Sequence, residues 1–274
     1  MEEKEIKRFI EQLKLEITYK KFLKNDIIYQ LIETFNTPNT VFKKQNYSNE
    51  IEGPLKIVLN FYKEYNMEYY KIINQNIKSG RININKNNKK SFIDTKSNTT
   101  IIKLNGNDGD IFTIVHELAH FIDKNSKPAI IPDEYWFLSE TFAFYIEKKL
   151  EKWLVNKNYK NLIYTRRNNR IYFENKMLKA IKNELYYEDI YREKGIIEEN
   201  DIDTKKIKSI IRYNVPYNIV NYLLQYPLAN ILSSYLIDDG TMQDDKQLIE
   251  KCLNKNLYKI LENFSLIENL YNNL

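Results

Sequence analysis

The only two histidines of this 274-residue chain, His116 and His120, lie four residues apart, and Glu117 follows the first of them. On an α-helix, residues four apart lie on one face, so the two imidazoles can share one zinc ion. In such an H-E-x-x-H pattern, the glutamate takes a proton from a water at the open position of the metal. The pattern therefore predicts a zinc-dependent hydrolase with Glu117 as general base. The alternative is an ordinary amphipathic helix that carries two histidines.

A third metal ligand is expected, because catalytic zinc sites usually have three protein ligands and one open position. The sequence offers no third histidine, so a carboxylate on the next predicted helix is the best candidate. Glu140 lies there among large apolar residues, where a carboxylate is costly unless it is paired or bound to a metal. We predict Glu140 as this ligand; an exposed helix carboxylate is the alternative. Glu147, two turns later, is predicted to orient a ligand histidine, or else belongs to a solvated, charged helix face.

Apolar periodicity predicts the helices that must position these residues. Helices are expected at residues 3–35 (two helices), about 55–77, about 111–123, from 132 onward, and within 244–274, and a proline-kinked helical run surrounds Pro227. Either Asp108 or Asp110 is expected to cap the helix that carries the histidines. The chain is therefore predicted to be mainly helical.

Strands are expected just before the histidine helix. The segments RININ (81–85) and TTIIKLN (99–105) are alternating or rich in β-branched residues, which favours two or more strands. For both segments, the alternative to an edge strand that holds a peptide is a plain structural hairpin. The predicted fold is mainly α (α+β), with a small sheet beside the H-E-x-x-H helix. We expect an N-terminal helical segment at residues 1–78 and a catalytic region at residues 79–274, joined in one compact unit.

The cysteine content, the apolar stretches and the charge of the chain limit where the protein can act and what it can bind. The single cysteine, Cys252, cannot form an intramolecular disulfide, and the first residues lack an apolar signal core, so a cytoplasmic location is expected. No stretch approaches the roughly 18 consecutive apolar residues of a membrane span. The net charge of +5 arises from 42 basic and 37 acidic residues. We interpret the short basic clusters at residues 86–90 and 166–170 as solvated faces, and expect neither membrane nor nucleic-acid partners.

The order of the predicted ligands, H-E-x-x-H and then Glu140, is typical of gluzincins. More specifically, the chain resembles the oligoendopeptidase F and thimet oligopeptidase family in a shortened form. The segments TIIKLNGNDGDIFTIVHELAHFID and SETFAFYIE (139–147) carry the resemblance, and RIYFENK (170–176) is weakly similar. The resemblance covers roughly residues 99–236. It implies a zincin-like catalytic domain with one Zn²⁺ and a peptide substrate, which the edge strand of the small sheet can hold by main-chain hydrogen bonds.

The same resemblance extends to the tyrosine-rich segment at residues 206–236. It implies that Tyr222, with Tyr217 upstream, donates a hydrogen bond to the oxyanion, because phenolic hydroxyls stay protonated at neutral pH. The alternative for each tyrosine is ordinary packing. Asn214 stands where the family has a histidine, and this predicts weaker transition-state stabilisation. The chain is also shorter than the enzymes of the family, which predicts a more open cleft.

These features predict a zinc-dependent metallopeptidase that hydrolyses peptide bonds in peptides or unfolded segments. One alternative is a binding protein that keeps the zincin fold but catalyses weakly, as Asn214 and the short N-terminal part suggest. A second alternative is a selective protease toxin or effector that cuts one host protein. A purely structural zinc is disfavoured, because such sites usually have four Cys or His ligands and the chain has only His116, His120 and Cys252.

Overall fold

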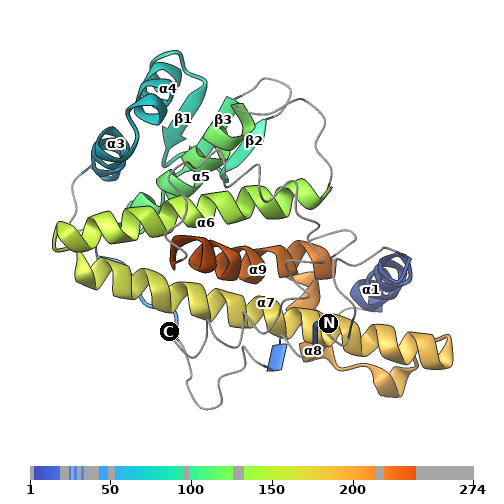
Figure 1. Cartoon of the computed structure of the whole chain (residues 1–274). Coiled ribbons are helices and arrows are strands. Elements are labelled where there is room, and N and C mark those ends of the chain that lie inside the picture. The colour runs from blue at the N-terminus through green and yellow to red at the C-terminus, as the bar shows by residue number, and fades with distance from the viewer. Residues whose placement is uncertain are drawn as a thin grey trace. The chain divides into compact units, whose positions relative to one another are not determined.

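The computed structural model describes residues 3–18, 25, 28–29, 32–33, 43–48, 53–94, 99–125, 133–213 and 219–238. The chain divides into two compact units. The first unit contains residues 1–43 and 170–227, and the second contains residues 44–169 and 228–274. Helices dominate the described residues, and one small sheet lies among them (Figure 1), which confirms the expected mainly helical composition.

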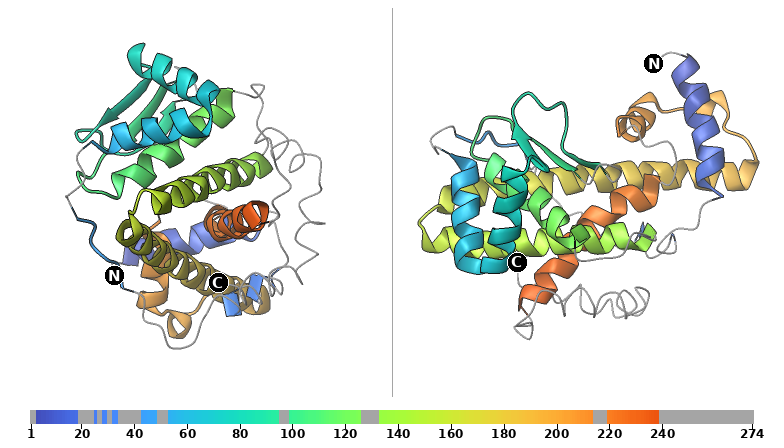
Figure 2. Two further views of the ribbon diagram at one scale, coloured as in Figure 1. Left: turned by 60° about the vertical axis from the view of Figure 1, so that its left-hand side comes forward. Right: turned by 90° about the horizontal axis from the view of Figure 1, so that it is seen from above.

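The second unit holds most of the elements around the predicted ligands. Its described part contains α3 (Pro54–Tyr65), α4 (Met67–Lys78), β1 (Ile82–Asn85), β2 (Phe92–Asp94), β3 (Thr99–Lys103), α5 (Asp110–Asn125) and α6 (Asp133–Asn156). The first unit contains α1 (Glu3–Glu16), the 3-10 helix η1 (Glu199–Asp201) and α8 (Thr204–Ile211). Two helices, α7 (Lys160–Lys194) and α9 (Ile219–Asp238), have residues in both units. Both helices are drawn in Figures 1 and 2.

Some predicted elements fall outside the described residues. These are the helices expected within 244–274 and most of the second helix expected before residue 35. The boundary expected near residue 78 lies between α4 and β1, and both of these elements belong to the second unit. Among the helices of the described ranges, none combines the length and the apolar character that a membrane span requires.

The single helix predicted at about 55–77 is wrong, because the chain forms two helices, α3 and α4. Between them, Asn66 has an extended backbone conformation, with φ −153° and ψ 105°. Its side chain accepts hydrogen bonds from the backbone N–H groups of Glu68 and Tyr69, at 3.0 and 3.2 Å. These N–H groups lie in the first turn of α4 and have no partner within the helix, so Asn66 is an effective N-cap.

The strands form a three-stranded sheet, in the order β1-β3-β2, within the described residues. β1 and β3 are parallel, and the register pairs Ile82 with Thr100; β2 and β3 are antiparallel. The prediction of two or more strands is confirmed, and β1 does not form a hairpin with β3, since these two strands are parallel. β3 has a partner on each side, so a further strand could pair only with β1 or β2.

The sheet and the helices share one hydrophobic core in the second unit. α4 contacts β1, α5 contacts β3, and α3 packs against α5 (Figure 1). Fully buried side chains in this core come from several elements and include Val58, Phe61, Ile73, Ile102, Ile114, Leu118, Ile146 and Leu150. Burial of each such side chain stabilises the fold by about 1.5–3 kcal/mol. The core therefore holds α5 and α6, the two helices with the predicted ligands, against a fixed framework.

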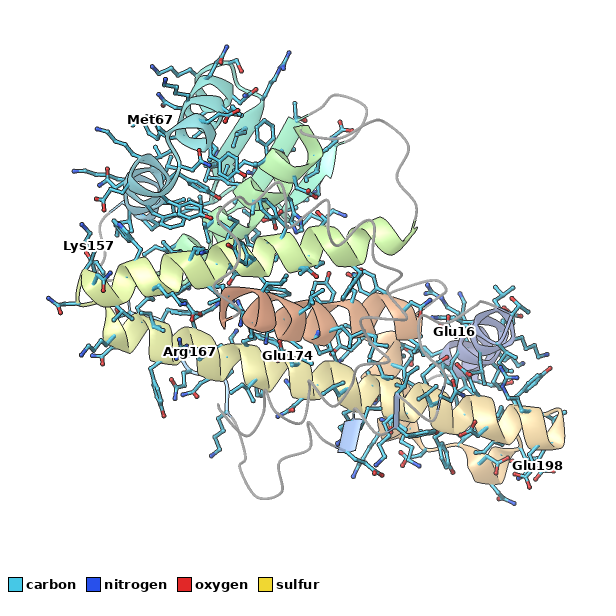
Figure 3. The ribbon with its side chains drawn as sticks, in the orientation of Figure 1. Glu16, Met67, Lys157, Arg167, Glu174 and Glu198 are labelled. Atoms are coloured by element: carbon cyan, nitrogen blue, oxygen red, sulfur yellow. The ribbon has the colours of Figure 1, made fainter. Side chains whose placement is uncertain are left out.

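Polar contacts also attach the end of α6 to α3. The indole N–H of Trp153 donates to Glu64 at 2.7 Å, and the Lys157 ammonium lies 3.3 Å from the same carboxylate. The ammonium of Lys157, labelled in Figure 3, also lies 5.0 Å from the centre of the Trp153 ring. Exposed ion pairs of this kind contribute little energy by themselves. They fix the direction in which α6 leaves the core.

Candidate metal centre

The loop between β3 and α5 sets where the histidine helix begins. The carboxylate of Asp110 accepts hydrogen bonds from the backbone N–H groups of residues 105–107, at 2.7, 2.7 and 3.3 Å. Asp110, one of the two residues predicted to cap the helix, therefore stabilises the loop that precedes the helix. Asp108 accepts a hydrogen bond from the Ser48 hydroxyl. A Cβ atom at Gly109 would lie 2.6 Å from the Tyr47 ring, so the close approach of this ring requires glycine.

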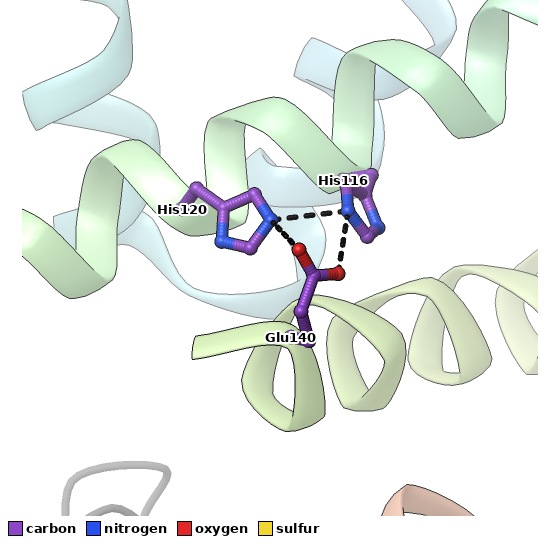
Figure 4. A group of neighbouring side chains, drawn as sticks. All are labelled: His116, His120 and Glu140. Carbon is purple, nitrogen blue, oxygen red and sulfur yellow. Dashed lines mark hydrogen bonds and ion pairs between the residues drawn. The ribbon is translucent and has the colours of Figure 1, made fainter. Parts of the chain in front are cut away.

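The three predicted ligands converge between α5 and α6 (Figure 4). The Nε2 atoms of His116 and His120 are 3.0 Å apart, and the Glu140 carboxylate oxygens lie 3.3 Å from the first and 3.5 Å from the second. Two ligand atoms of one tetrahedral zinc ion, each about 2.1 Å from it, are separated by about 3.4 Å. The spacing therefore fits a single ion. In the described part of the chain, these three residues could hold a metal ion.

Buried polar atoms support the same conclusion. Oε2 of Glu140 is buried without a hydrogen-bond partner, and its nearest cationic neighbour is the Nε2 atom of His116. A buried carboxylate oxygen without a hydrogen bond is costly, and a metal ion would satisfy it. The alternative to a ligand role for Glu140 was an exposed helix carboxylate. This alternative is wrong, because Glu140 is buried. The donor set therefore fits a divalent ion.

The second ring nitrogen of each histidine is also in contact with a partner. Nδ1 of His116 lies 2.7 Å from Oε1 of Glu147, and Nδ1 of His120 lies 2.8 Å from the Ser139 hydroxyl. When Nδ1 carries the proton, Nε2 presents a lone pair toward the space between the three ligands. The contact of Glu147 is the one predicted from the sequence. Ser139 was not among the predicted residues, and its only signal in the sequence is its place directly before Glu140.

Arg166 is a further residue that the sequence analysis did not identify. Its guanidinium donates to Oε2 of Glu147 from Nε at 3.1 Å and from Nη2 at 2.7 Å. The Glu147 side chain is 0% exposed and that of Arg166 is 24% exposed. The interpretation of residues 166–170 as a solvated face is therefore wrong at Arg166. Its partner lies on another helix, so no local pattern could reveal the contact.

The charges at the centre shift several pKa values. Burial alone would lower the pKa of His116, but the neighbouring carboxylates of Glu140 and Glu147 outweigh burial and raise this pKa to about 10. Burial would raise the pKa of Glu140, yet the two histidines lower it to about 2. Without a metal ion, a proton on His116 therefore balances the Glu140 carboxylate. A metal that binds here must displace that proton.

Two further groups have shifted pKa values. Burial raises the pKa of Glu117, and the charges of His116 and His120 oppose this shift without cancelling it. For Arg166, burial opposes the charge, but the Glu147 carboxylate raises the guanidinium pKa above its usual range. Glu117 is thus a carboxylate of raised basicity next to the first ligand. Arg166 stays cationic.

Of the two predicted oxyanion donors, Tyr222 lies among the described residues. Tyr222 lies on α9 in the first unit, is 42% exposed, and packs edge-on against Tyr226 with ring centres 5.9 Å apart. The three ligands belong to the second unit. Tyr217 and Asn214 lie outside the described residues. The roles of both tyrosines therefore stay predictions.

Comparison with known proteins adds no relative. No family model, no curated protein and no solved structure matches the chain. The resemblance to oligoendopeptidase F thus depends on short motifs alone. The geometry by itself supports one conclusion, that two imidazole nitrogens and one carboxylate on α5 and α6 form a group that can bind a metal ion.

Proposed function

We propose that the chain is a zinc-dependent metallopeptidase that hydrolyses peptide bonds in peptides or unfolded segments. The convergence of His116, His120 and Glu140 carries this proposal, since their ligand atoms all lie within 4.8 Å of one another. Two imidazoles and a carboxylate suit zinc well among divalent metals. Three protein ligands also leave one coordination position for chemistry, as in catalytic rather than structural zinc sites.

The fold proposal is a zincin-like catalytic domain. It is supported by the small sheet, by α4 and α5 packed against that sheet, and by a ligand glutamate on the following helix α6. The parallel pairing of β1 with β3 leaves β1 and β2 at the two edges of the described sheet. Either edge offers main-chain groups to an extended peptide.

In the proposed reaction, each residue of the centre has one task. His116, His120 and Glu140 would hold the zinc ion, which would lower the pKa of a water molecule and polarise the peptide carbonyl. Glu117 accepts a proton from the attacking water and returns it to the leaving amine nitrogen. Its raised pKa suits this role, since a carboxylate whose pKa lies nearer neutrality accepts a proton from water more readily. Glu147 and Ser139 accept the Nδ1 protons and so keep both Nε2 lone pairs available.

The proposed oxyanion donors have weaker support. Tyr222 and Tyr217 are assigned this role only through the family resemblance, and zinc also serves as an electrophile for the carbonyl oxygen. A Tyr222→Phe variant that cleaves peptides as the native protein does would remove Tyr222 from the mechanism without affecting the metal centre.

The first prediction tests Glu117. Glu117→Gln should keep one zinc per chain and lose peptide cleavage by about 10²–10⁴-fold, because the amide cannot accept the proton. The native and variant proteins are incubated with a mixed peptide pool, and the products are identified by mass spectrometry with and without a chelator. Glu68→Gln, a change to an exposed glutamate of the same unit, is the matched control and should cleave normally.

Two results would contradict the proposal. Normal cleavage by a zinc-loaded Glu117→Gln variant would exclude Glu117 as the general base. Stoichiometric zinc binding by the native protein without any chelator-sensitive cleavage would favour the alternative of a zinc-binding protein with weak catalysis.

A further inference from the structure

We propose that Arg166 is a positioning residue of the metal centre and acts on His116 through Glu147. This inference rests on the proposed function, since it takes His116 to be a metal ligand. Arg166 itself contacts Glu147 and Phe112, and neither of them is a ligand. Its effect therefore has to pass through a neighbour.

The first step is that the two carboxylate oxygens of Glu147 have different partners. Oε1 faces Nδ1 of His116 at 2.7 Å, and Oε2 accepts both hydrogen bonds from Arg166. Two N–H groups of one planar guanidinium converge on this oxygen and hold its position better than one point charge does. With Oε2 fixed, Oε1 cannot rotate away from His116. The ring of His116 is thereby held in one orientation.

The second step is the environment of Glu147. This side chain is fully buried, and a buried carboxylate is costly unless a cation and hydrogen bonds compensate it. Arg166 is the cation in contact with it on the side away from the metal centre. When Arg166 is removed, the carboxylate must move or take in water. Either change alters the position of the acceptor for His116.

The third step is the way in which Arg166 itself is held. The guanidinium carbon lies 5.3 Å from the centre of the Phe112 ring, and Phe112 precedes His116 by one helical turn on α5. Arg166 thus touches α5, the helix with the ligand histidines, and α6, the helix with Glu140. A side chain from α7 therefore links both ligand helices at the level of His116.

His120 provides a comparison within the same centre. Its Nδ1 faces the neutral hydroxyl of Ser139, which directly precedes Glu140 on α6. His116 is thus oriented by a carboxylate that is itself paired with an arginine, whereas Nδ1 of His120 contacts a single hydroxyl. Loss of Arg166 should affect the site through His116 alone.

The chain also supplies a matched control. Arg167, the next residue of α7, pairs with Glu151 of α6 at 3.0 Å and is 65% exposed (Figure 3 labels Arg167). This pair joins the same two helices through an arginine and a glutamate, with one hydrogen bond in place of two. Glu151 lies one turn beyond Glu147 and is absent from the contacts of His116. A general loss of helix packing would therefore appear in both variants, and a loss of positioning only in one.

The experiment measures zinc affinity by competition with a chromophoric chelator, so that it needs no peptide substrate. Arg166→Gln should bind zinc about 10–100-fold more weakly than the native protein. Arg167→Gln should stay within about twofold of it, because Arg167 is exposed and its partner Glu151, although buried, is not among the residues in contact with His116. Arg166→Lys keeps the positive charge but lacks the planar guanidinium with its two donors. This variant should recover most of the zinc affinity that Arg166→Gln loses.

A double-variant comparison then tests the route through Glu147. Glu147→Gln should weaken zinc binding by itself, and adding Arg166→Gln to it should cause no further loss, because the relay is already broken. The neutral double variant also avoids an unpaired buried charge, so this comparison holds if Arg166→Gln alone does not fold.

Either of two results would overturn the inference: native zinc affinity in a folded Arg166→Gln variant, or an equal loss on adding Arg166→Gln to the native and Glu147→Gln proteins. A native protein that binds no zinc would instead overturn the proposed function, so the two failures are distinguishable.

Discussion

At the residue scale, the candidate metal centre contains a pair of opposite charges. The raised pKa of His116 and the lowered pKa of Glu140 describe a protonated imidazole beside an ionised carboxylate. The same two side chains must lose that proton before they bind a divalent metal. Proton and metal therefore compete for one position.

This competition predicts opposite pH responses with and without metal. The folded pKa of His116, about 10, exceeds its unfolded value of about 6.5, so its contribution to stability is complete below pH 6.5 and is lost as pH rises toward 10. Metal-free protein should thus lose on the order of 2–5 kcal/mol of unfolding free energy across this range. With zinc present, stability should instead increase with pH, since metal binding releases the proton.

Urea denaturation at pH 6.5 and pH 10, with and without a chelator, measures these trends. The metal-free His116→Gln variant serves as control and should lack this part of the pH dependence. A metal-free native protein whose pH profile matches that of the variant would contradict the prediction.

The sequence predicts the ligands better than it predicts their supports. The spacing of His116 and His120 is local, and the helical period alone brings them together. Glu140 could be predicted because a carboxylate among large apolar side chains needs a partner. Arg166 could not, since its contact with Glu147 depends on how α6 packs beside α7. That packing is set by the whole core and leaves no trace in local spacing.

At the element scale, the helices follow apolar periodicity, whereas breaks and strand pairings do not. The prediction merged α3 and α4 because buried side chains continue at helical spacing from Tyr62 to Tyr69 and Ile73. The break depends on a single side chain, Asn66. Strand pairing is non-local, and the alternation in RININ is equally compatible with parallel and antiparallel partners. The parallel pairing of β1 with β3 was therefore beyond prediction.

The N-cap of α4 gives a prediction at this scale. Asn66→Ala removes the acceptor for two backbone N–H groups and should lower the unfolding free energy by about 0.5–2 kcal/mol. Asn66→Asp keeps an acceptor at the helix N-terminus and should be nearly neutral. Urea denaturation of the three proteins under one set of conditions makes the comparison. Equal stability of the native and alanine proteins would show that the cap contributes nothing.

At the scale of the whole molecule, the residues proposed to hold and support the metal belong to one of the two units. All of α5 and α6 lies in the second unit, and Arg166 lies in it too, four residues before the first-unit part of α7 begins at Arg170. Cooperative unfolding of two such units need not be a single step. Metal binding should therefore act first on the second unit.

Zinc should stabilise this unit by mass action. At a free zinc concentration a thousandfold above Kd, the gain is about 4 kcal/mol, and each kcal/mol raises Tm by about 2–4 °C for a domain of this size. Hydrogen exchange followed by mass spectrometry should show the added protection in peptides from α5 and α6. Peptides from α1 and α8, in the first unit, are the internal reference. Equal protection of both sets, or none in α5 and α6, would contradict this prediction.

The presence of both histidines within 3.0 Å of each other, in a chain that has no others, makes the centre unusually easy to observe. If histidine alone is labelled with ¹⁵N, every imidazole resonance in an NMR spectrum comes from this one place. The tautomer of each ring, the arrival of a metal and the strength of the Glu147 contact can then be followed separately, without assigning the rest of the protein.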